Sequence, residues 1–268
     1  MNDAWSGGPF GERGTCLLAP NPGMMTLDGT NTWLLREPGA TRGVVVDPGP
    51  VEDGHLDLLD EQSGDVGLVL VTHHHFDHSE VAEELGRRKG CPVRALSPDL
   101  SFGADPLADG EVIDVDGLRL EVVLTPGHTE DSISLLLPAE RTLLTGDMVL
   151  GRGTTVIAWP DGDLASYFTS IERMRDLAIS GAVETLWPAH GPVLHDARGT
   201  LEHYLVHRRQ RLAQVESALA SLGITHPDPD DESLPRRVVE VVYADVDESL
   251  WGAAEWSVRA QLAYLARR

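Results

Sequence analysis

Lysine is nearly absent from this sequence, because Lys89 is the only one and almost all of the positive charge is carried by arginine. Acidic residues outnumber basic residues by 43 to 21, which gives a formal net charge of -22. A charge of this size repels polyanions unless a local basic patch outweighs the overall field. The composition therefore argues against a general nucleic-acid-binding protein.

Cysteines and long apolar runs are also scarce. Cys16 and Cys91 are the only cysteines, which argues against a disulfide framework but still allows one pair. No stretch approaches the run of about 20 apolar residues that a membrane helix needs, and residues 1–13 lack a basic and then apolar signal pattern. With 268 residues, 41% of them apolar, the chain can nevertheless bury a large core. We therefore expect a globular, cytoplasmic protein.

Short apolar runs of strand length recur along the chain, many of them bounded by Gly, Pro or Asp. The predicted strands are residues 15–19, 31–36, 43–47, 66–72, 118–125, 132–137, 142–145 and 185–187. Helical patterns lie between them: Ser79 is the expected cap of a helix that runs to Lys89. Residues 163–180 place apolar side chains on one helical face before Gly181. This mixture of strands and helices predicts a layered α/β domain.

From residue 199 onward the pattern becomes helical. Leucine and valine recur at helical spacing, and a polar turn at 226–233 separates this first helix from two shorter helical patterns, 234–243 and 249–267. We therefore expect a larger domain over residues 1–198 and a small C-terminal helical domain over residues 199–268.

The densest chemical signal follows directly after a predicted strand, where the chain reads His-His-His-Phe-Asp-His. Alternate side chains of an extended segment share a face, so His73 and His75 can converge on one ion while His74 points away. Asp77 and His78, beyond the turn, can face a second ion. An exposed polar loop is the alternative, but such a cluster at a strand end is costly without bound ligands.

Three further candidate ligands also follow strands: His128 in Thr-Pro-Gly-His-Thr, Asp147 in Thr-Gly-Asp, and His190 in Pro-Ala-His-Gly. Each signal is weak alone, because a lone histidine at a strand end is more often structural than a ligand. Together, four loops at one edge of a sheet carry five imidazoles and two carboxylates. This is the ligand set that two zinc ions require.

The order HxHxDH, TPGHT, TGD and PAHG resembles the metallo-β-lactamase superfamily over roughly residues 15–195. The resemblance implies a four-layered αββα sandwich with the metals at one edge of the paired sheets. It assigns the first zinc to His73, His75 and His128, the second to Asp77, His78 and His190, and a bridging role to Asp147. Asp47, in Val-Asp-Pro-Gly, matches a family position that orients a ligand of the first loop.

Four further segments, residues 26–33, 151–156, 191–195 and 204–209, are similar to the lactamase-beta-like-2 subfamily. That subfamily includes a single-strand-directed endoribonuclease and related thioesterases, and its C-terminal helices form a winged-helix-like domain. This sequence ends at Arg268, directly after its last predicted helix, so we expect the wing hairpin to be missing. The β-lactamases proper carry Cys or Ser at the position of Asp147, which argues against antibiotic hydrolysis.

Two zinc ions, or other divalent metals in their place, would supply a metal-bridging hydroxide as the nucleophile, because they lower the pKa of a bridging water to about 7. We expect Asp77 to orient this hydroxide and Asp147 to hold both ions, which makes these two the expected catalytic residues. His195 and His207 are candidate proton donors for the leaving group. Ordinary loop or helix histidines are the alternative for both.

The pocket wall is expected to come from two segments. The loop of residues 20–32 has the apolar side chains Met24, Met25 and Leu27 near its tip, and Trp159 follows the Asp147 segment. Packing in the core or on the surface is an equally good interpretation of these side chains.

Three functional classes remain. The first is hydrolysis of a small ester or thioester, which the acidic composition permits. The second is an endoribonuclease, which the subfamily favours and the net charge opposes. The third is a non-catalytic binding module, which an intact ligand set disfavours. We therefore predict a binuclear zinc hydrolase acting on a small-molecule ester or thioester, with nucleic acid as the alternative substrate and no membrane partner.

Overall fold

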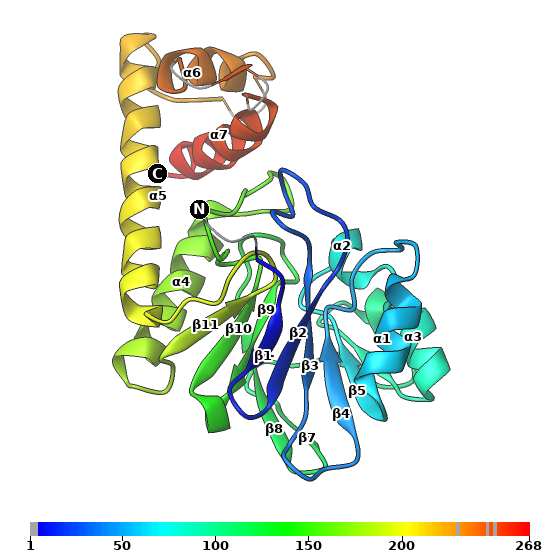
Figure 1. The fold of residues 1–268 in the computed structure, drawn as a ribbon. Helices are drawn as coiled ribbons and strands as arrows, with labels where there is room; N and C mark the ends of the chain where they lie inside the picture. The colour runs from blue at the N-terminus through cyan, green and yellow to red at the C-terminus, as the bar shows by residue number, and fades with distance from the viewer. Residues whose placement is uncertain (1–4, 229–230, 245–246, 249–250) are drawn as a thin grey trace.

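The computed structural model describes residues 5–228, 231–244, 247–248 and 251–268. Its strands form two mixed sheets that lie face to face (Figure 1). The first sheet consists, in spatial order, of β1 (Gly8–Phe10), β2 (Gly14–Leu18), β3 (Asn31–Leu35), β4 (Gly43–Val46), β5 (Val66–Leu70) and β6 (Val93–Arg94). The second consists of β11 (Thr185–Pro188), β10 (Thr142–Gly146), β9 (Ile133–Leu137), β8 (Leu118–Leu124) and β7 (Val112–Val115).

Helices cover the outer faces of both sheets. The helices are α1 (His55–Ser63), α2 (Phe76–Ser79), α3 (Ala82–Lys89), α4 (Leu164–Ile179), α5 (Ala197–Ser221), α6 (Leu234–Val242) and α7 (Trp251–Ala266). Side chains of α1 and α3 pack on the first sheet, and those of α4 and α5 pack on the second. This arrangement is a four-layered αββα sandwich, as the resemblance of the motifs implies.

Three hydrophobic clusters separate these four layers. The central one lies between the sheets and contains Leu35 and Leu135, together with the stacked rings of Trp33 and Trp187, whose centroids are 4.6 Å apart. Strands covered on both faces show no alternation of polar and apolar residues. In β9, for example, all five residues are buried. The sequence-based strands could therefore be recognised by their continuous apolar runs.

The fold brings the carboxyl ends of four strands to one edge. β8 is antiparallel to β9, which is antiparallel to β10, so β8 and β10 run in the same direction. β11 is parallel to β10, and its end is joined to the first sheet where the Asn31 amide donates to the Ala189 carbonyl at 2.7 Å. The loops after β5, β8, β10 and β11 therefore meet where the two sheets are joined.

All eight predicted strands are present, and the predicted ends lie within about two residues of the observed ends. Different methods of assigning secondary structure differ by the same amount. The prediction that Ser79 caps a helix is wrong. Ser79 is the last residue of α2, its hydroxyl donates to the carbonyl oxygens of His74 and His75, and α3 begins only at Ala82. This short helix turns Asp77 and His78 back toward the sheet edge.

The C-terminal part consists of three helices. α5 is 25 residues long; its first half packs on α4, and its second half packs on α6 and α7 in a separate hydrophobic cluster. Between residues 189 and 268 the described residues contain no β-strand. No helix in the described part of the chain has the length and hydrophobicity needed to cross a membrane.

Candidate metal centre

Three imidazoles converge at the joined edge of the sheets. The Nδ1 atom of His75 lies 3.0 Å from Nε2 of His73 and 3.1 Å from Nε2 of His128. Nδ1 of His128 is 2.8 Å from the carbonyl oxygen of Val156, which can only accept, so this nitrogen carries the proton and Nε2 carries the lone pair. Ligands bound tetrahedrally to zinc at about 2.0–2.1 Å are about 3.3 Å apart. The three nitrogens are therefore spaced as the ligands of one ion.

A second group adjoins the first. Oδ2 of Asp77 lies 3.2 Å from Nε2 of His190 and 3.4 Å from Nε2 of His78. Asp147 lies between the two groups: its Oδ1 is 3.3 Å from Nε2 of His190, and its Oδ2 is 3.7 Å from Nε2 of His128. One carboxylate oxygen thus faces each group, as a bridging ligand requires.

Buried atoms without partners show that these residues fit metal ions. Nε2 of His78, Nε2 of His190 and Oδ1 of Asp147 are fully buried and have no hydrogen-bond partner among the described residues. Leaving one buried polar atom unpaired costs about 1–3 kcal/mol, so three in one place are costly without a ligand. Two sets, His73 with His75 and His128, and Asp77 with His78 and His190, each have ligand atoms within 4.8 Å of one another.

The two groups differ in their electrostatics. Burial, with neighbouring histidines, holds the pKa of His73 well below its usual value and lowers the pKa of His75 to about 4. Burial would also lower the pKa of His190, but the Asp147 carboxylate outweighs it and raises this pKa to about 9. Burial would raise the pKa of Asp77, but His78 and His190 outweigh it and lower this pKa. The first group therefore offers neutral nitrogens, whereas the second is rich in charge.

Asp47 lies where the resemblance expects a residue that orients a ligand. It is 1% exposed, and its Oδ1 accepts a hydrogen bond from the Thr72 amide at 2.8 Å. Its Oδ2 accepts from the Thr72 hydroxyl at 2.8 Å and lies 3.0 Å from Nδ1 of His78. Since the carboxylate can only accept, Nδ1 of His78 carries a proton and Nε2 faces the second group.

His74 lies outside both groups. Its Nδ1 is 2.8 Å from Oδ1 of Asp131, and 44% of its side chain is exposed. The two candidate proton donors are also not among the residues that line the cavity over the ligands: His195 lies between β11 and α5, and His207 lies on α5. Trp159 does not line that cavity either, because its ring packs beneath the guanidinium of Arg267 at 5.3 Å.

The cavity over the ligands has a volume of about 260 Å³. Four of the candidate ligands line it: His75, Asp77, His128 and Asp147. Its walls are mostly apolar, with Met24, Met25 and Leu27 from one loop and Leu150 and Val156 from another. Arg152 also lines it, but its guanidinium forms an ion pair with Asp28. That ion pair joins the two loops that form the walls.

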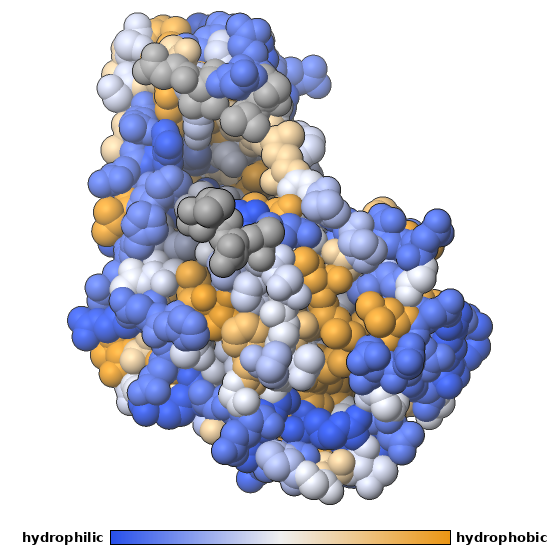
Figure 2. Space-filling view, viewed as in Figure 1, coloured by the Kyte–Doolittle hydropathy of each residue, from blue (hydrophilic) through white to orange (hydrophobic). Residues whose placement is uncertain are grey.

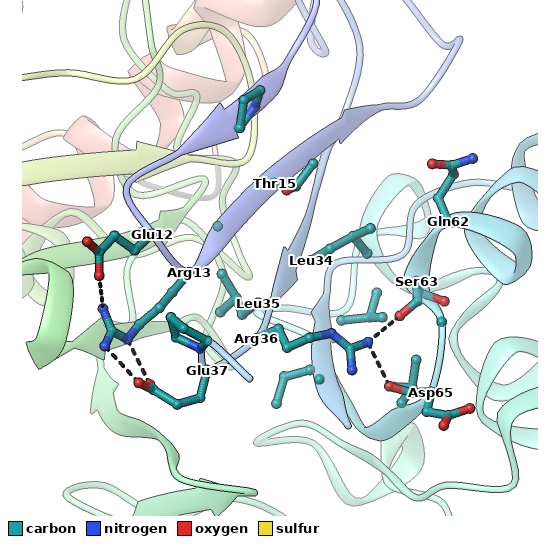
Figure 3. A pocket seen from close by; sticks show the side chains of 18 of the residues that line it. Glu12, Arg13, Thr15, Leu34, Leu35, Arg36, Glu37, Gln62, Ser63 and Asp65 are labelled. Carbon is teal, nitrogen blue, oxygen red and sulfur yellow. Dashed lines mark hydrogen bonds and ion pairs between the residues drawn. The ribbon is translucent and has the colours of Figure 1, made fainter. Parts of the chain in front are cut away.

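A larger cavity of about 740 Å³ lies on the outer face of the first sheet, beside the end of α1 (Figure 3). Figure 2 shows hydrophobic side chains gathered over the strands in the middle of this view. Its two arginines already have partners: Arg13 pairs with Glu37, and Arg36 donates to the carbonyl oxygens of Ser63 and Asp65. It contains no cluster of metal ligands among the described residues, so the chemistry belongs to the smaller cavity.

An αββα sandwich with a His and Asp cluster at its joined edge defines a metal-dependent hydrolase. A model of the metallo-beta-lactamase superfamily matches residues 25–180, and a model of the beta-lactamase associated winged helix domain matches residues 235–268. The chain is also 33% identical to a "Beta-lactamase-like protein 2 homolog" of Drosophila melanogaster over 94% of this chain and 87% of that protein. The chain therefore belongs to the metallo-beta-lactamase superfamily, as its motifs predict.

Solved structures show the same fold. A beta-lactamase domain protein from Burkholderia ambifaria superposes with a TM-score of 0.77 at 21% identity, covering 99% of this chain and 90% of that one. The protein TTHA1623, solved in a di-iron-bound form, superposes with a TM-score of 0.52 at 22% identity, covering 68% of this chain and 93% of that one. At these identities the likeness concerns the fold alone.

Proposed function

We propose that this hydrolase cleaves a small ester or thioester. The observation that carries this proposal is the cavity over the ligands, whose volume of about 260 Å³ lies near the lower end of the range for ligand pockets. Its apolar walls suit an acyl group. Arg152, the only arginine or lysine among the described lining residues, is already paired with Asp28.

Two metal ions fit the site, and we propose that they are zinc. His73, His75 and His128 would hold the first ion, Asp77, His78 and His190 the second, and Asp147 both. Bound metals supply a Lewis acid and a nucleophile derived from water at neutral pH. Oδ2 of Asp77 lies beside the second group while the residue still lines the cavity, which supports a role for its carboxylate in orienting an attacking oxygen. Metal analysis of protein loaded with zinc, iron or manganese, with turnover measured for each, tests the identity of the metal.

Cleavage of single-stranded RNA is the second candidate, and the match of residues 235–268 to a winged helix domain favours it. The net charge of -22 opposes it. A protein that neutralises several phosphates loses affinity steeply as salt rises. This chain offers few cations for such contacts, so we place RNA cleavage behind acyl hydrolysis.

The test compares kcat/KM for short acyl thioesters, an aryl ester, a phosphodiester reporter and single-stranded RNA at physiological salt. Met25→Glu places a charge on the apolar wall and should raise KM for the acyl substrates at unchanged metal content. Met25 is 45% exposed, so the substitution does not disturb the core. Val51→Glu, at a site 67% exposed and outside the cavity lining, is the matched control. Inert thioesters together with RNA cleavage that is lost in Asp147→Asn would overturn the proposal.

A further inference from the structure

The segment that joins β10 to α4, residues 147–163, contains neither helix nor strand. Nevertheless it is packed: Met148, Val149 and Ile157 are at most 2% exposed. It begins with Asp147, and further along it holds His128, because Nδ1 of His128 lies 2.8 Å from the Val156 carbonyl and 3.1 Å from the Thr155 hydroxyl. Without a regular hydrogen-bond ladder of its own, this segment depends on its neighbours for its shape.

Side chains of two helices hold the segment in place. On α4, the hydroxyl of Tyr167 donates to the Met148 carbonyl at 2.7 Å. On α5, the hydroxyl of Tyr204 accepts a hydrogen bond from the Leu150 amide at 2.9 Å. Arg208, one turn further along α5, donates from Nη2 to the Thr155 carbonyl. These contacts make α5 a structural partner of the metal site, although none of its residues lines the cavity.

Arg208 is unusual among the arginines of this chain. It is 6% exposed and forms no ion pair with a described residue, and its Nε has no hydrogen-bond acceptor. Its guanidinium instead lies over the ring of Tyr167, with the Cζ atom 5.0 Å from the ring centroid. Burying a charge without a counterion costs stability, and apolar replacement of buried ionic groups is often neutral or stabilising. The fold alone therefore gives little reason for an arginine here.

We propose that Arg208 is a positioning residue of the metal site. By fixing the Thr155 carbonyl, it holds in place Thr155 and Val156, whose hydroxyl and carbonyl oxygens lie against Nδ1 of His128. The Val156 carbonyl then keeps the proton of His128 on Nδ1 and leaves the lone pair of Nε2 for the first ion. Partners that orient metal ligands in this way are worth about 10- to 100-fold in metal affinity. Because Arg208 acts through the backbone, we expect a loss of about 10-fold, at the lower end of that range.

The experiment measures metal affinity directly, so its result does not depend on the substrate proposed above. Arg208→Met removes the donor and keeps much of the volume. Competition with a chromophoric chelator should show the binding of the first ion weakened about 10-fold. The absorption bands of cobalt bound at the first position should shift as well. Arg208→Lys keeps a donor with shorter reach. Its affinity for the first ion should lie between those of the original protein and Arg208→Met.

Arg209→Met is the matched control, because Arg209 follows on the same helix, is 58% exposed and pairs with Glu172. It should bind both ions as the original protein does. Unchanged metal affinity in Arg208→Met would overturn the proposal, as would an equal loss in Arg209→Met. If Arg208→Met does not fold, Arg208→Lys decides alone: a several-fold loss of first-ion affinity supports the proposal, and no change overturns it.

Discussion

Replacing Asp47 with asparagine should weaken the second metal position while leaving the fold intact. The backbone of Asp47 has a φ of 50°, a conformation that asparagine also adopts readily. The amide oxygen can still accept from the Thr72 amide, as Oδ1 does at 2.8 Å. The amide nitrogen, however, then stands 3.0 Å from Nδ1 of His78, where two donors face each other.

The size of the effect follows from this conflict. His78 can relieve it by moving its proton from Nδ1 to Nε2, but Nε2 is the atom that lies 3.4 Å from Asp77 in the second group. The lone pair needed for the ion is then lost. Outer partners of metal ligands are worth about 10- to 100-fold in affinity, which corresponds to about 1.4–2.7 kcal/mol.

Chelator competition on stripped and reloaded protein resolves the two binding steps, and circular dichroism follows folding. In Asp47→Asn the step assigned to the second group should shift by this factor, while the step assigned to the first group stays within about twofold. Asp57→Asn, at a side chain 80% exposed, is the control and should change neither step. The reasoning fails if both steps are unchanged in Asp47→Asn, or if the loss falls on the step assigned to His73, His75 and His128.

Three further predictions follow. Asp147→Asn should steeply weaken the binding of both ions and lower turnover, whereas His74→Ala should change neither, because the His74 ring faces Asp131; equal metal content and turnover in the two variants would refute the assignment. Burial would lower the pKa of His190, but Asp147 outweighs it and raises this pKa to about 9. His190 must therefore lose a proton before it can bind a metal ion. Burial would also lower the pKa of His78, but Asp147, Asp47 and Asp77 outweigh it and hold this pKa well above its usual value. Second-ion affinity should therefore fall at least about tenfold per unit as pH drops from 9 to 6, whereas first-ion affinity, with the pKa of His75 at about 4, should hardly change in chelator titrations. Leu135→Ala, at a fully buried site between the sheets, should lower the free energy of unfolding by about 2–5 kcal/mol in urea titrations, unlike Val112→Ala at an exposed position.

The apolar runs predict a layered α/β domain, because strands that are covered on both faces appear as unbroken apolar segments. The four-layered αββα sandwich follows only from the resemblance of the motifs to a known family. The sequence did not reveal β1, β6 or β7, which are short or alternate in burial. The sequence did not predict α1 either. Its N-cap residue, Gly54, has no side chain to cap the helix, and the helix has no basic residue in its last turn. Elements with such weak local signals are stabilised by tertiary packing, which a sequence pattern does not record.

The proposed ligands were visible because each follows a strand within a short, chemically distinctive segment. The residues that orient them were harder to find. In the sequence, segments 151–156 and 204–209 carry only a subfamily likeness, although Thr155 and Arg208 within them contact each other. A backbone carbonyl that holds His128 leaves no signature in side-chain chemistry, and a contact between an irregular loop and a distant helix has no sequence period.

The joined sheet edge gives metal binding a role in how the chain folds. The first sheet supplies the ligands from His73 to His78, and the second supplies His128, Asp147 and His190, so neither sheet alone can complete either position. His190 also lies beside Gly29, whose carbonyl oxygen is 3.2 Å from its Nδ1. Ions that bind only the assembled pair stabilise that pair in proportion to the logarithm of their concentration. As the chain is synthesised, its first sheet must therefore wait for the loop after β8 to complete the first position, and for β11 and His190 to complete the second.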